Sequence, residues 1–103
     1  MIEIKDETEK VILVGVALSD QDDTKESLEE LKDLVSTAGA ETAGMLIQNR
    51  EQQHPATYVG KGKIEELKNM IWELRATGIV CDDELSPAQM KNLQDELDVK
   101  VMD

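Results

Sequence analysis

Residues 10–18 read KVILVGVAL, a lysine followed by eight uncharged and mostly aliphatic residues. A continuous apolar run of this length, rich in valine, is typical of a strand that is buried on both faces of a parallel sheet. Gly15 within the run indicates close packing by a neighbouring helix. The stretch therefore predicts an α/β fold in which this strand lies inside the sheet.

Three downstream segments space their apolar residues three and four positions apart, as the buried face of an amphipathic helix requires. We expect helices over residues 25–38, from Lys61 or Lys63 onward, and after Ser86. Trp72 falls beside the second apolar stripe and is expected to cover its rim. The three stripes consist of Leu28, Leu31, Leu34, Val35 and Ala38; of Ile64, Leu67, Met70, Ile71 and Leu74; and of Met90, Leu93 and Leu97.

The third helix has the clearest start signal in the chain. Ser86 is the expected N-cap, Pro87 suits the first helical position, and Gln89 completes a capping box. Leu85 and Met90 are spaced to form a hydrophobic staple across that start. The sequence therefore predicts a sharp helix boundary at Ser86.

Apolar segments over residues 41–48, 79–82 and 99–102 predict three further short strands. Gly78, just before the second of them, suits the left-handed cap that ends the preceding helix. Strands that alternate with helices imply right-handed crossovers and a parallel sheet with helices on both faces. We therefore expect a single α/β domain over all 103 residues, with a small four-stranded parallel sheet in the order 2-1-3-4.

Residues 54–68, HPATYVGKGKIEELK, run from a polar loop into the second predicted helix. Gly60, Lys61, Gly62 and Lys63 then fall at a helix N-terminus. Glycine lets a ligand approach the backbone, the first-turn N–H groups are unpaired, and the helix dipole adds partial positive charge. This chemistry predicts an anion site, and the alternative interpretation is that the two glycines only shape a tight turn.

The chain carries 23 acidic and 11 basic residues, a formal net charge of −12. Long-range repulsion from phosphate backbones is expected, so any contact with nucleic acid must be local. Within residues 50–63, the three basic residues Arg50, Lys61 and Lys63 stand against one acidic residue, Glu51, which gives a net charge of +2. This contrast favours the central loop as the contact surface.

Cellular location follows from cysteine usage and hydropathy. Cys81 is the one cysteine and lies in an apolar strand pattern, which indicates a reduced protein without a catalytic thiol. The longest apolar run, eight residues, is far below the roughly 20 residues of a membrane span, and the acidic N-terminus lacks the basic start of a signal peptide. We expect a soluble cytoplasmic protein, and we assign His54 in the loop no role.

Asp82, Asp83 and Glu84 follow the third predicted strand and lie beside residues 19–23 in the expected strand order. Ligands in open α/β sheets bind at such a switch point, and carboxylates there could hold Mg²⁺ as in a receiver-like phosphoacceptor domain. Acidic residues before a helix also stabilise its N-terminus through capping and the dipole. Because that explanation needs no metal, we assign no metal site.

No motif for catalysis stands out in the chain. G-x-x-x-x-G-K-[ST], which cradles phosphates and supplies a metal-binding hydroxyl, is absent. G-x-G-x-x-G fails because Glu65 stands at the third glycine. No set of serine, cysteine and histidine suggests a nucleophile with its base. We expect no catalytic residue and no cofactor in this chain.

The string PATYVGKGKIEELK, residues 55–68, resembles the signature of the N-terminal domain of HflX-type ribosome-associated GTPases. The resemblance continues in order through VILVGVAL, SLEELKDLVSTAGAE and DDELSPAQMKNLQDELDVKVMD, and it covers nearly the whole chain from Lys10. Four segments in the family's order and spacing make the resemblance specific.

The resemblance implies that the domain precedes a helical arm and a GTP-hydrolysing domain in a longer protein. That protein would use GTP and Mg²⁺ and act on the large ribosomal subunit. The implied partners are the large subunit with its rRNA and the protein's own C-terminal helical and GTPase domains. We expect neither of those two domains within the 103 residues.

Two interpretations of the chain remain open. As a binding module, the loop would grip rRNA phosphates through basic side chains and free helix N–H groups, while Tyr58 stacks on an unpaired base. As a scaffold, the GKGK repeat only shapes a turn and the domain orients its C-terminal partners. The candidate rRNA- and anion-binding residues are Arg50, Tyr58, Gly60, Lys61, Gly62 and Lys63.

Overall fold

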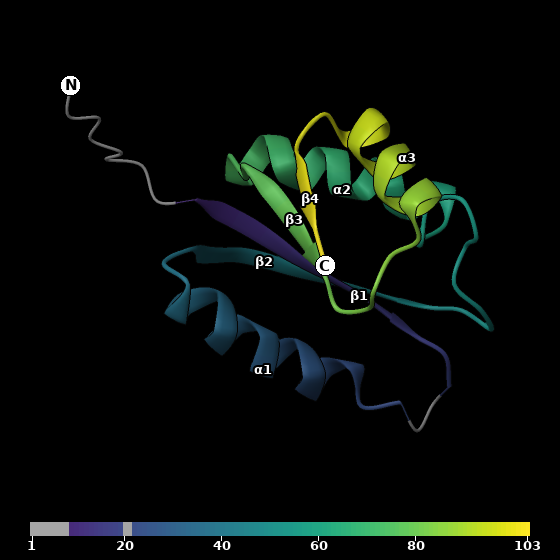
Figure 1. The fold of residues 1–103 in the computed structure, drawn as a ribbon, viewed down its shortest axis with the longest axis horizontal. Helices are drawn as coiled ribbons and strands as arrows, with labels where there is room; N and C mark the ends of the chain where they lie inside the picture. The colour runs from purple at the N-terminus through teal and green to yellow at the C-terminus, as the bar shows by residue number, and fades with distance from the viewer. Residues whose placement is uncertain (1–8, 20–21) are drawn as a thin grey trace.

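The computed structural model describes residues 9–19 and 22–103. Within them, four parallel strands form one sheet in the order β2-β1-β3-β4, and three helices connect the strands (Figure 1). The predicted fold class and strand order are confirmed. The strands are β1 (Lys10–Ala17), β2 (Glu41–Asn49), β3 (Gly78–Cys81) and β4 (Lys100–Met102), and the helices are α1 (Thr24–Thr37), α2 (Lys61–Leu74) and α3 (Pro87–Leu97).

β1 lies inside the sheet because it pairs with β2 on one side and with β3 on the other. All of its residues after Lys10 are buried, as the unbroken aliphatic run predicted. The close helix packing expected at Gly15 is also present, since a Cβ there would stand 2.6 Å from Thr24 Cγ2 at the start of α1. β2 and β4 form the two edges of the sheet.

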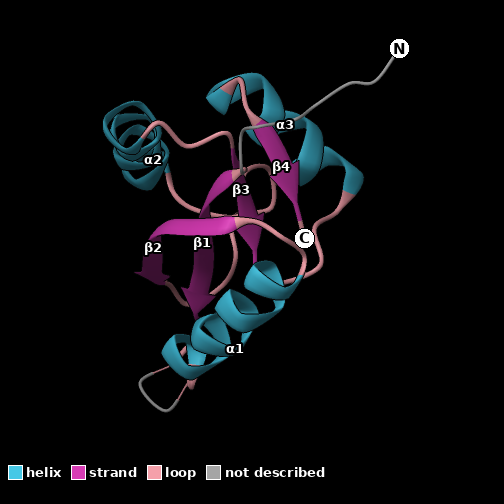
Figure 2. Cartoon of the chain, turned by 90° about the vertical axis from the view of Figure 1, so that its left-hand side faces the viewer, coloured by secondary structure: helices cyan, strands magenta, loops and turns pink. Residues whose placement is uncertain are grey.

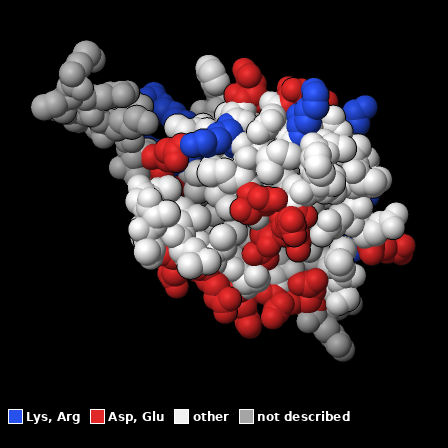
Figure 3. Space-filling model, viewed as in Figure 1, with Lys and Arg blue, Asp and Glu red and all other residues white. Residues whose placement is uncertain are grey.

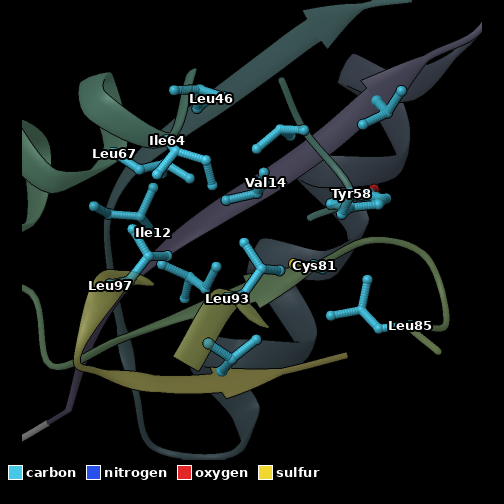
Figure 4. Close-up of a cluster of buried hydrophobic side chains, with 14 of the residues drawn as sticks. Ile12, Val14, Leu46, Tyr58, Ile64, Leu67, Cys81, Leu85, Leu93 and Leu97 are labelled. Carbon is cyan, nitrogen blue, oxygen red and sulfur yellow. The ribbon is translucent and has the colours of Figure 1, made fainter. Parts of the chain in front are cut away.

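The helices cover both faces of the sheet, with α2 and α3 on one face and α1 on the other (Figures 1 and 2). The side chains of β1 alternate between two apolar clusters, so that Ile12 packs on the α2–α3 side and Leu13 on the α1 side. The larger cluster is shown in Figure 4 and draws on both helices through Ile64, Leu67, Leu93 and Leu97. Among the described residues, no helix has the length and apolar character to cross a membrane.

The predicted start of α3 is confirmed in detail. Ser86 Oγ accepts a hydrogen bond from the backbone N–H of Gln89 at 3.1 Å, and Gln89 Oε1 accepts one from the backbone N–H of Ser86 at 2.9 Å. Pro87 occupies the first helical position. Leu85 is buried and Met90 packs against the same apolar cluster, which agrees with the predicted staple. Two otherwise unpaired donors are thereby satisfied.

Other details of the helices differ from the sequence prediction. The C-cap of α2 is Arg75, whose φ of 55° lies in the left-handed region, so the prediction that Gly78 caps this helix is wrong. Gly78 instead lies in β3, where a Cβ would stand 2.8 Å from the Lys100 carbonyl oxygen. Leu34 and Trp72 are 67% and 84% exposed, so they neither widen the core nor cover its rim. Each is next in sequence to a residue that packs against the core. Because successive side chains on a helix point about 100° apart, Leu34 and Trp72 point away from the core.

Candidate functional site

Residues 50–60 connect β2 to α2 and contain a hydrogen-bonded turn, which we call the 54–58 turn. The backbone N–H of His54 donates to the Tyr58 carbonyl at 3.0 Å, and that of Tyr58 donates to the His54 carbonyl at 2.8 Å. Inside the turn, His54 Nδ1 accepts from the backbone N–H groups of Ala56 and Thr57 at 3.1 and 3.3 Å. The His54 ring therefore closes the turn, a structural role that the sequence did not reveal.

Tyr58 points into the core and is fully buried (Figure 4). Its φ of 67° lies in the left-handed region, which bulky side chains rarely adopt. Its hydroxyl donates to Asp83 Oδ2 at 2.5 Å. Burial, followed by the bond to Asp83, raises the pKa of Tyr58 above its ordinary value, so the phenol remains a neutral donor. A buried ring offers no face to an unpaired base, and the predicted stacking role does not fit this structure.

The Tyr58 ring fills the position where open α/β sheets bind their ligands. Such ligands lie outside the carboxyl ends of the strands, at the point where the strand order reverses. Here that point lies between β1 and β3, and Tyr58 packs in one cluster with Val16, Cys81 and Leu85 around the ends of these strands. A side chain from the protein's own loop thus occupies the crevice.

Two of the three acidic residues after β3 accept hydrogen bonds from other side chains of the protein. Asp82 Oδ1 accepts a hydrogen bond from Ser27 Oγ of α1 at 3.1 Å, and Asp83 accepts the one from Tyr58. Figure 3 shows acidic side chains gathered around this connection and along α1. Among residues 9–19 and 22–103, no group of three or more His, Cys, Asp or Glu residues is arranged to hold a metal ion. Asp20, one of the acids after β1, lies outside the described residues. The contacts therefore favour a structural role for Asp82 and Asp83 over a receiver-like site.

Arg50 reaches the start of α2 by packing against Gly60. Gly60 is the N-cap of α2, and its backbone N–H donates to Gln48 Oε1 at 2.7 Å. A Cβ on Gly60 would stand 2.7 Å from Arg50 Nη1 and 3.1 Å from Gln48 Nε2. Because φ at Gly60 is −71°, the glycine is required by this close approach and not by its backbone conformation. A hydrogen bond orients the guanidinium, since Arg50 Nε donates to the Gln52 carbonyl at 2.9 Å.

Lys61 and Lys63 extend from the first turn of α2 into different surroundings. Lys63 Nζ pairs with Glu66 Oε2 at 2.8 Å, a partly exposed pair of the kind that contributes little to stability. Within the described part of the chain, neither Arg50 nor the exposed Lys61 forms an ion pair. Lys61 also borders a cavity of about 230 Å³ together with His54, Thr57, Ile64, Glu65 and Glu96.

The first turn of α2 has no side-chain cap. The backbone N–H groups of Lys63 and Ile64 both donate to the Gly60 carbonyl, at 3.0 and 3.1 Å. In the described chain, those of Lys61 and Gly62 have no such acceptor. A Cβ on Gly62 would meet nothing within 4 Å, so the backbone there is open. Two N–H donors and three cationic side chains therefore lie at one helix start, where the helix dipole also favours an anion.

This helix start does not fit GTP with Mg²⁺. Gly62, Lys63 and Ile64 take the last three positions of G-x-x-x-x-G-K-[ST], but Ile64 is buried and stands where the metal-binding hydroxyl belongs. Thr57 replaces the first glycine of that motif, and Lys63 already pairs with Glu66. The arrangement can hold a phosphate or carboxylate group, and it lacks the parts that cradle a triphosphate and its metal.

The structure brings together five of the six residues predicted for the site. We call them the basic surface: Arg50, Gly60, Lys61, Gly62 and Lys63. Tyr58 lies apart from them in the core. Gln48, which holds the Gly60 N–H, was not predicted, because a lone glutamine in a strand carries no sequence signal for a contact with a residue 12 positions away.

Residues 25–103 match the model of a protein family described as GTP-binding GTPase N-terminal. The chain is also similar to several proteins named GTPase HflX. It is 63% identical to that of Lacrimispora saccharolytica, 44% identical to that of Caldanaerobacter subterraneus and 34% identical to that of Escherichia coli. Each of these alignments spans 103 residues, which is 100% of this chain and 24% of the relative. The chain thus covers about a quarter of the length of the curated relatives it matches.

Proposed function

The chain belongs to the family of GTP-binding GTPase N-terminal domains, of the HflX type, and from this premise we propose that it binds rRNA of the large ribosomal subunit as part of a longer GTPase. The basic surface makes the contact. The observation that carries the proposal is the packing of the Arg50 guanidinium on Gly60, beside two N–H groups at the start of α2 that have no acceptor among the described residues.

Charge explains why the contact must be local. A chain with net charge −12 repels RNA at long range, so the phosphate must reach a place where donors converge. A guanidinium, an ammonium that has no ion-pair partner among the described residues, and helix N–H groups supply such donors at one helix start. With Tyr58 buried, the described basic surface contacts phosphates and has no aromatic face for a base.

We also infer how the other tasks of the longer protein are divided among its parts. Residues 1–103 form a single domain without a catalytic role, and the longer protein binds and hydrolyses GTP with Mg²⁺ through its other parts. This domain then contacts two kinds of partner in the cytoplasm, the large subunit and its own C-terminal helical and GTPase domains. Support for this division comes from the poor fit of the α2 start to GTP and from the GTPases HflX among the relatives.

A scaffold that only orients the GTPase domain is the second candidate. It is favoured by the Lys63–Glu66 pair, because that contact satisfies the Lys63 ammonium without a ligand. Under this alternative, the charges of the basic surface are dispensable for subunit binding.

The affinity of the full-length protein for purified large subunits separates the two candidates. Lys61→Ala with Lys63→Ala is expected to weaken binding at least about tenfold, the effect of losing one charge-assisted hydrogen bond. Lys25→Ala with Lys32→Ala removes the same charge from exposed positions on α1 and serves as the matched control. Equal effects of the two double variants, or no effect of either, would contradict the proposed contact.

A further inference from the structure

α3 binds the 54–58 turn through two side chains on its inner side. Gln89 Nε2 donates to the His54 carbonyl at 2.9 Å, and Asn92 Nδ2 donates to the Ala56 carbonyl at 2.9 Å. The partners are 35 and 36 residues apart in the sequence, so these bonds join two separate parts of the chain. Together with Tyr58 and Asp83, they give the turn three side-chain bonds to the segment from β3 through α3.

Gln89 uses both ends of its amide. Its oxygen accepts from the Ser86 N–H in the capping box, while its nitrogen donates to His54. The residue is 7% exposed, and both of its polar ends are satisfied. The same side chain therefore starts α3 and holds the turn, which fixes the position of one relative to the other.

The 54–58 turn also lies next to Lys61. His54 and Thr57 line the cavity of about 230 Å³ that Lys61 borders, with Glu96 of α3 on the same cavity. Without its two bonds to α3, the turn would be held from this side by Tyr58 alone, and its His54 and Thr57 end could move within this space. The ordering of the loop would then have to occur during binding, at a cost in affinity.

We propose that Asn92 and Gln89 are positioning residues, which hold the 54–58 turn against the start of α2 and so keep the basic surface in one arrangement before RNA arrives. Neither side chain contacts the RNA. The proposal rests on the proposed function for its effect on binding, whereas its effect on the turn is independent of that function.

Asn92→Ala tests the effect on the turn. The variant removes the donor to Ala56, and alanine is the better helix former at this position. In the full-length protein, we expect amide hydrogen exchange in the 54–58 turn to accelerate about three- to tenfold, the equivalent of one hydrogen bond. The denaturant midpoint should fall only slightly, because the gain in helix propensity offsets part of the lost bond. Gln94→Ala, at an exposed position of the same helix, is the control and should change neither quantity.

Gln89→Glu provides a second variant. Glutamate keeps an acceptor for the Ser86 N–H in the capping box but cannot donate to the His54 carbonyl when ionised. Exchange in the turn should therefore accelerate as in Asn92→Ala. Unchanged exchange in both variants would overturn the proposal.

The effect on binding is measured with the same proteins and purified large subunits. Asn92→Ala should weaken binding about three- to tenfold, and Gln94→Ala should bind as the unchanged protein does. Accelerated exchange with unchanged affinity would overturn the positioning role. Failure of the proposed function would appear differently, as an unchanged affinity of the Lys61→Ala, Lys63→Ala variant.

Discussion

The starts of α2 and α3 differ in what happens to the backbone N–H groups that the first turn of a helix leaves unpaired. At α3, Ser86 and Gln89 exchange two hydrogen bonds and satisfy donors that a helix leaves unpaired. At α2, the N-cap is Gly60, no side chain caps the helix, and the N–H groups of Lys61 and Gly62 remain free within the described chain. A closed start stabilises the fold, and an open start beside cationic side chains is available to an anion.

The largest expected effects are losses of stability on replacing a buried leucine, and they should be similar in size for the two helices. Leu67 in α2 and Leu93 in α3 are both fully buried in the same apolar cluster. Leu67→Ala and Leu93→Ala should each lower the free energy of unfolding by about 2–5 kcal/mol, because each leaves a cavity. Denaturant titration measures both. A cost below about 1 kcal/mol for one variant would show that the helices differ in packing as well as in their starts.

Alkaline pH should lower the stability of the protein through the turn before α2, because a buried phenol anchors that turn and no phenol anchors the start of α3. Burial raises the pKa of Tyr58 in the folded protein and raises that of Cys81 to about 12. The unfolded chain loses these protons at lower pH than the folded protein. The unfolded pKa values are near 9 for Cys81 and near 10 for Tyr58. The contribution of each group to the free energy of unfolding is therefore fully present below its unfolded pKa and is lost as pH rises above it.

Tyr58→Phe removes one of these two groups. Above pH 10, the free energy of unfolding should fall with pH less steeply in this variant, by about 1.4 kcal/mol per pH unit. Lysine titration is common to both proteins and cancels in the comparison. Parallel stability curves between pH 9 and 11 would refute the buried neutral phenol.

Ser86→Ala opens the closed start. Loss of the cap should lower the free energy of unfolding by about 0.5–2 kcal/mol, since the Gln89 N–H loses its acceptor. Affinity for the large subunit should stay within about twofold of the original under conditions where the variant is folded. An unchanged denaturant midpoint would show that Ser86 does not cap α3.

Gly60→Ala alters the open start without altering any charge. The N-cap change should cost about 0.5–1 kcal/mol, because alanine is a poorer N-cap than glycine. The new Cβ would stand 2.7 Å from Arg50 Nη1 and must displace that side chain from the helix start. Binding of the full-length protein to large subunits should therefore weaken, while the denaturant midpoint falls by no more than this N-cap cost explains. Full affinity in the variant would mean that the position of Arg50 is irrelevant.

Sequence patterns predicted the structural features that depend on residues close together in the chain. The aliphatic run of β1, the helical stripes and the Ser86 capping box are local signals, and they led to the correct fold and strand order. The positively charged segment also marked the helix start at Lys61. Exposure of Trp72 was missed because a stripe of period 3.6 defines its centre better than its edge.

Features of the site that depend on distant contacts did not appear in the sequence. Tyr58 looked like a surface aromatic because it stands in a polar loop, and only the fold shows the crevice and the Asp83 carboxylate that hold it inside. The bonds from Gln89 and Asn92 to the turn join residues 35 and 36 positions apart. Gly60 was predicted as a place where a ligand approaches the backbone, and in this structure its close neighbour is Arg50.

The most direct test of the open α2 start is the salt dependence of binding to purified large subunits. We predict that Lys61→Ala with Lys63→Ala in the full-length protein flattens the slope of log affinity against log salt concentration by about 0.7–0.9 for each phosphate that the variant no longer neutralises. The Lys25→Ala, Lys32→Ala control should keep the original slope. A double variant at Lys61 and Lys63 that stays folded and retains both the original slope and the original affinity would contradict phosphate binding at this helix start.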